Sequence, residues 1–94
     1  MKTTKADFEL FKQYANGYID KLGLKDWSVH FAHDDVDGSY ALTTSTTGGR
    51  VATIQLGKYW DDLRPKTEAE IKKLALHEVC HILLAPILRE AKER

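Results

Sequence analysis

Residues 77 to 81 read His-Glu-Val-Cys-His and place three ionisable side chains in the apolar stretch 74–86. Successive residues of a helix turn by about 100°, so His77 and His81 lie about 40° apart on one face and can reach a single metal ion. Neutral imidazole suits zinc, which lowers the pKa of a bound water to about 7. Glu78 is near enough to such a water to act as its general base.

The stretch around this motif is apolar nearly all round the helix, a pattern typical of a buried helix. Ionisable side chains are costly there without partners, and a bound metal with its water would satisfy all three. The alternative is that His77 and His81 are core histidines bonded to backbone carbonyls, with Glu78 paired to a lysine such as Lys73. The complete motif on a capped helix favours the metal site.

Two helices are expected in this chain. Apolar residues recur at helical spacing from about Lys5 to Leu22, with Thr4 as the N-cap and Gly23 at the C-terminal stop. The segment Thr67 to Glu70 has the form of a capping box that opens the motif helix. Pro86 is expected to end or kink that helix, because proline lacks the N–H that the helix needs.

Three strands are expected between the helices. Apolar and polar residues alternate over residues 26–33, and Asp37-Gly38 predicts a tight hairpin turn into the strand 39–44. Gly48-Gly49 predicts a second turn before the strand 50–56. We therefore expect one α+β domain over residues 1–94, with an N-terminal helix, a three-stranded antiparallel meander and a C-terminal motif helix, both helices packed on one face of the sheet.

Composition narrows the partners and the compartment. Lys plus Arg and Asp plus Glu both number fourteen, so no net field attracts a nucleic-acid backbone or an anionic membrane. Cys80 is the single cysteine, which excludes an intramolecular disulfide and favours a reducing compartment. The apolar run after the motif is far too short for a membrane span, and the first residues lack a signal-peptide core. We expect a cytoplasmic protein.

The other two histidines and the cysteine are not expected to bind metal. His30 and His33 lie on or near a predicted strand and are expected to be surface histidines. Cys80 shares its helix direction with Leu76 and Leu83, so a small packed thiol is expected rather than a metal ligand.

His77, Glu78 and His81, together with the order of elements over about residues 5–86, resemble the zincin metallopeptidases. The chain looks most like the small intracellular zincin-like domains of bacteria and their phages. The resemblance implies that the two histidines ligate zinc, that Glu78 is the general base of peptide-bond hydrolysis, and that the last strand, within residues 50–56, pairs with a peptide or protein substrate.

The third zinc ligand differs between zincins. The metzincin form needs Gly at 84 and His at 87, where this chain has Leu84 and Ile87, and no histidine follows His81. Gluzincins take a glutamate from a following helix, where Glu90 and Glu93 are available, and Glu90 is the candidate. Because catalytic zinc sites normally use three protein ligands, we expect either a truncated chain or a naturally reduced domain. The alternative function is a non-catalytic interaction or structural module with a weak or incomplete metal site.

Overall fold

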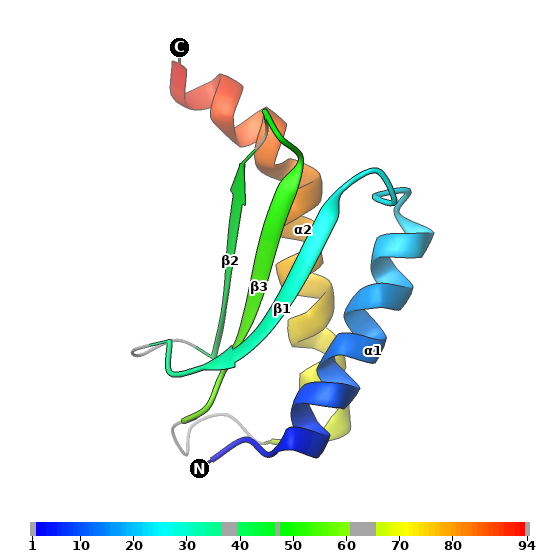
Figure 1. Ribbon diagram of the computed structural model, residues 1–94, viewed down its shortest axis with the longest axis vertical. Coiled ribbons are helices and arrows are strands. Elements are labelled where there is room, and N and C mark those ends of the chain that lie inside the picture. The colour runs from blue at the N-terminus through cyan, green and yellow to red at the C-terminus, as the bar shows by residue number, and fades with distance from the viewer. Residues whose placement is uncertain (1, 37–39, 47, 61–65, 94) are drawn as a thin grey trace.

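Two helices cover one face of a three-stranded sheet (Figure 1). The computed structural model describes residues 2–36, 40–46, 48–60 and 66–93, with side chains described as far as Leu84. In chain order the elements are α1 (Lys5–Lys21), β1 (Ser28–Asp34), β2 (Ala41–Thr46), β3 (Val51–Gly57) and α2 (Glu68–Glu93). The predicted α+β class is confirmed, and so is the placement of both helices on the same face.

The sheet is mixed, so the predicted antiparallel meander is wrong. Its strand order is β1-β3-β2, with β3 parallel to β1 and antiparallel to β2. The turn at Gly48-Gly49 joins neighbouring strands as expected. By contrast, β3 separates β1 from β2, so the segment with Asp37-Gly38 does not connect paired strands; those two residues lie outside the described ones. Alternation assigns the faces of a strand but contains no information about its neighbours.

The core lies between β3 and the two helices. Alternate residues of β3 point toward the helices, because successive side chains of a strand face opposite ways. Their partners on α2 recur every three or four residues, which places one stripe of that helix against the sheet. The buried apolar residues of these elements are Phe11 and Ala15 on α1, Ala52, Ile54 and Leu56 on β3, and Ile71, Leu74, Ala75, Val79 and Ile82 on α2.

Both helices begin at the predicted caps. The Thr4 hydroxyl accepts a hydrogen bond from the Asp7 backbone N–H, and the Asp7 carboxylate accepts one from the Thr4 N–H, which completes a capping box. Gly23 ends α1 with a φ of +71°, a conformation that glycine adopts without strain. At the start of α2, the Thr67 hydroxyl accepts a hydrogen bond from the Glu70 backbone N–H at 3.3 Å.

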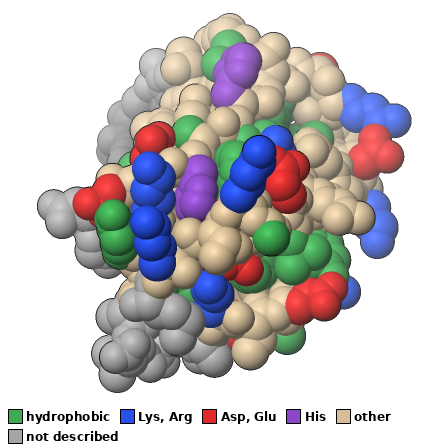
Figure 2. Space-filling model, turned by 60° about the horizontal axis from the view of Figure 1, so that its bottom comes forward, with side chains coloured by type: hydrophobic (Ala, Val, Ile, Leu, Met, Phe, Trp, Pro, Cys, Tyr) green, Lys and Arg blue, Asp and Glu red, His purple; other side chains and the backbone are tan. Residues whose placement is uncertain are grey.

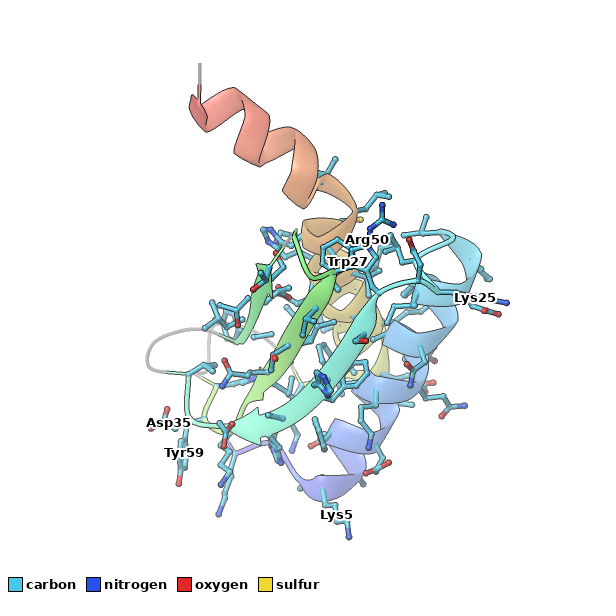
Figure 3. The ribbon with its side chains drawn as sticks, turned by 45° about the horizontal axis from the view of Figure 1, so that its top comes forward. Lys5, Lys25, Trp27, Asp35, Arg50 and Tyr59 are labelled. Carbon is cyan, nitrogen blue, oxygen red and sulfur yellow. The ribbon has the colours of Figure 1, made fainter. Side chains whose placement is uncertain are left out.

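Helix α2 does not end at Pro86. It continues to Glu93, and its C-terminal part leans away from the axis of the first part, which agrees with the expected kink (Figures 1 and 3). The helix is also not buried all round, because Leu76, Leu83 and Leu84 are each about two-fifths exposed. Neither described helix has the length and apolarity to cross a membrane.

Two connecting turns meet at one end of the sheet, where Figure 3 shows Arg50 beside Trp27. Arg50 adopts a φ of +51° directly before β3, and its guanidinium pairs with the carboxylate of Asp26. The Arg50 carbonyl also accepts a hydrogen bond from the Ser28 N–H at 2.8 Å. These contacts hold the beginning of β1 against the β2–β3 turn.

Candidate metal centre

The two motif histidines converge as the helical spacing predicts. Their Nε2 atoms lie 3.2 Å apart, with ring centroids 4.8 Å apart and the rings nearly perpendicular, at 87°. Two nitrogen ligands at 2.0–2.1 Å from a tetrahedral zinc are about 3.3 to 3.4 Å apart. His77 and His81 therefore present two nitrogen atoms at almost the separation that zinc requires, on a side of α2 that is open to solvent.

Glu78 is the buried member of the motif. The residue is 4% exposed and falls on the stripe of α2 that packs against the sheet, between Ala75 and Ile82. Its Oε1 accepts a hydrogen bond from the Thr43 hydroxyl at 2.9 Å, and its Oε2 lies 3.9 Å from His77 Nε2. One carboxylate oxygen is thus held by β2, while the other faces the histidine pair.

The core-histidine alternative is wrong. The side chain of His77 is 66% exposed, and His81 is also exposed. Lys73 is the proposed partner of Glu78, but its Nζ instead lies 3.8 Å from Glu70 Oε1. The argument that a metal must compensate two buried imidazoles fails as well, because only the carboxylate of the motif is buried.

Within the described part of the chain, the metal-binding side chains that gather are those of the motif. The ligand atoms of His77, Glu78 and His81 all lie within 4.8 Å of one another. Cys80 does not belong to this group and is half-buried. The backbone of Glu90 belongs to α2, but its side chain lies outside the described ones, so its role as a third ligand stays a prediction.

The two remaining histidines lie on β1 and do not join the cluster. His30 is exposed, as expected. His33 is not a simple surface residue. Its ring stacks on that of Phe8, with the ring centroids 5.1 Å apart, and its Nε2 lies 2.7 Å from the Thr3 hydroxyl. Since that hydroxyl donates to the Gly57 carbonyl, the His33 ring donates to it. Burial, and then the nearby Lys58 ammonium, hold the pKa of His33 below its ordinary 6.5.

A cavity adjoins His77 on α2. It has a volume of about 460 Å³, and the described residues that line it are Lys73, Leu74, Leu76, His77 and Cys80. Pockets of this size accommodate small organic groups, including amino-acid side chains. The apolar lining therefore leaves room for a small organic group beside His77, next to the candidate metal centre.

The edge strand beside the motif is β2, not β3. The predicted substrate-pairing strand, residues 50–56, corresponds to β3, whose two sides are occupied by β1 and β2. In the described sheet β1 and β2 are both edge strands, and it is Thr43 on β2 that contacts Glu78. The sequence analysis did not identify Thr43. A polar residue on the helix-facing side of a strand indicates a buried polar contact and could have been used to find it.

Charge on the surface is mixed where it can be seen. On the face shown in Figure 2, Lys and Arg side chains alternate with Asp and Glu side chains, and no single sign dominates that face. The chain as a whole has equal numbers of the two. The face in this view therefore shows no concentrated patch of positive charge.

Comparison with known proteins identifies no relative. No protein-family model, curated protein or solved structure matches this chain. The resemblance to zincins therefore depends on the motif, on its helix and on the geometry of the three side chains.

Proposed function

We propose that this chain is a small zincin-like metallopeptidase that hydrolyses peptide bonds, with zinc held by His77 and His81. The observation that carries the proposal is the 3.2 Å separation of two exposed Nε2 atoms beside a buried carboxylate. Imidazole nitrogens are preferred zinc ligands, and the separation fits a tetrahedral ion.

Bound zinc supplies an acidified water and polarises a carbonyl. His77 and His81 would hold the ion through Nε2, and their exposure would leave a substrate free access to it. Glu78 takes the proton of the attacking water at Oε2, because Oε1 is already engaged by Thr43. The same oxygen can then deliver that proton to the leaving amine.

The surroundings support a peptide substrate. An extended peptide can add a strand to a free sheet edge, and β2 offers such an edge beside α2 within the described structure. The cavity beside His77 would receive a side chain next to the scissile bond. Affinity would then come from backbone hydrogen bonds, and preference from the apolar lining of the cavity.

Glu90 can act as the third ligand only if α2 changes shape. At about 1.5 Å per residue, a straight α2 would carry Glu90 about 13 Å along the axis from His81. A direct bond to the same ion therefore requires the helix to open near Pro86. The competing function is a non-catalytic module with a weak metal site. It is favoured because the described cluster, with Glu78 assigned as the base, leaves two histidines rather than three protein ligands for the ion.

Zinc titration by calorimetry tests the metal centre. His77→Ala and His81→Ala should each abolish binding, whereas His30→Ala, an exposed histidine outside the cluster, should bind zinc like the wild type. At about 100 times its Kd, zinc should add about 2.7 kcal/mol of stability, equivalent to a rise in Tm of roughly 10 to 20 °C. Equal zinc affinity in all three variants would exclude this site.

Glu78→Gln tests the catalytic assignment. The amide oxygen can still accept the Thr43 hydrogen bond, while the amide nitrogen cannot take a proton from water. Hydrolysis of a peptide library with added zinc should fall by about 10² to 10⁴-fold, with zinc affinity unchanged. Zinc binding without any hydrolysis by the wild-type protein would favour the non-catalytic module.

A further inference from the structure

We infer that Thr43 is a positioning residue that selects which oxygen of Glu78 acts as the base. This inference rests on the proposed function, because it assigns a role within the same reaction. The supporting geometry is the contact of Thr43 Oγ1 with Glu78 Oε1 at 2.9 Å, while Oε2 lies on the side of His77. The hydroxyl thus occupies one carboxylate oxygen and leaves the other for water.

Thr43 is held in a defined place by the sheet. It lies opposite Ile54 in the β2–β3 register, and residues opposite each other in an antiparallel pair point to the same face. Ile54 is fully buried and Thr43 contacts Glu78, so Thr43 also points toward α2. Threonine is stiff at χ1, which reduces the conformational freedom that the hydroxyl must lose to make this bond.

The Thr43 hydroxyl has a single proton to donate. Its other nearby acceptor, the Glu78 backbone carbonyl, is 3.4 Å away, so the carboxylate oxygen at 2.9 Å is the better acceptor. The Glu78 side chain can rotate about three torsions. Among the described side chains, Thr43 is the one that donates a hydrogen bond to its carboxylate. Loss of that donor would allow the carboxylate to turn away from the direction of His77.

A pair of substitutions separates this role from general packing. Thr43→Val keeps the branched shape but removes the donor, and Thr43→Ser restores the donor without the methyl group. We expect Thr43→Val to lower kcat by about 10- to 100-fold, the equivalent of one hydrogen bond to a charged group, with KM nearly unchanged. Thr43→Ser should recover most of the rate. Thr53→Val, on the central strand β3 and on the face turned away from the helices, is the control and should have wild-type kinetics.

A second readout does not depend on hydrolysis. In metal-free protein labelled with ¹³C-glutamate, the side-chain carboxyl resonance missing from Glu78→Gln identifies Glu78. Thr43→Val should shift this resonance, whereas Thr43→Ser and Thr53→Val should leave it in place. An unshifted resonance in Thr43→Val would show that the hydroxyl does not hold the carboxylate in solution, and would overturn the inference directly.

The possible failures are distinguishable. Wild-type protein without zinc-dependent hydrolysis overturns the proposed function and, with it, the catalytic role of Thr43. Hydrolysis that persists within about twofold in Thr43→Val overturns the positioning role while leaving the proposed function intact. Equal rate losses in Thr43→Val and Thr43→Ser would assign the effect to packing and also overturn it.

Discussion

Replacing Glu78 with methionine should make the metal-free protein more stable. Glu78 is 4% exposed and lies on the apolar stripe of α2, so its carboxylate has lost most of its water. The desolvation of a buried ion costs several kcal/mol, and the Thr43 bond returns about 1.5 to 3 kcal/mol. Methionine has a similar length and no charge, and the half-buried Thr43 hydroxyl can turn to water. We expect a net gain of about 1 to 2 kcal/mol.

Urea unfolding followed by tryptophan fluorescence at pH 7, with a chelator present, measures this gain. It corresponds to a rise in Tm of about 4 to 16 °C for a chain of this size. Glu9→Met, at an exposed glutamate on α1, is the control and should change stability by less than about 0.5 kcal/mol. A fall of more than about 1 kcal/mol in the free energy of unfolding of Glu78→Met would refute the reasoning, because the carboxylate would then stabilise the fold rather than destabilise it.

Three further outcomes are expected. Cys80→Ala should cost about 1 kcal/mol and leave zinc affinity unchanged, since the thiol is half-buried and outside the cluster; loss of affinity in calorimetry without unfolding would make it a ligand. Arg50→Gly should be about 1 kcal/mol more stable than Arg50→Ala in urea, because both lose the Asp26 pair but only glycine relieves the positive φ; equal stabilities would contradict this. Because the pKa of His33 is lowered on folding, the unfolded chain binds more protons just below pH 6.5, so stability falls as the pH drops through that window. Thermal melts of His33→Gln between pH 5 and 7.5 should show a weaker dependence than the wild type, and identical slopes would assign the effect to other groups.

The helices could be predicted because their determinants are local. Thr4 caps α1 through Asp7, three residues away, and Gly23 ends it through its own backbone conformation. Strand pairing has no such local determinant. The Asp37-Gly38 pair favoured a hairpin, but the real neighbour of β1 is β3, which lies beyond β2 in the chain. A parallel pair depends on packing across the whole domain rather than on the residues of a turn.

The candidate site also has a local part, which the sequence could predict, and a non-local part, which it could not. The convergence of His77 and His81 is a property of any α-helix, so their spacing was sufficient to predict it. Which face of α2 turns toward the sheet was not predictable, because apolar residues surround the motif. The contact between Thr43 and Glu78 joins residues 35 positions apart, and it exists only once β2 has docked against α2.

The position of β3 also sets the order in which the sheet can assemble during synthesis. The strand that emerges last becomes the middle one, so β1 and β2 leave the ribosome without the neighbour that both require in the described sheet. After Gly57 has emerged, β3 can pair first with β2 across their short turn and then with the more distant β1. A nascent chain arrested before that point would expose two unpaired strands, which are templates for aggregation. The histidine-bearing helix emerges later still, so the candidate metal centre is completed on a sheet that already has its central strand.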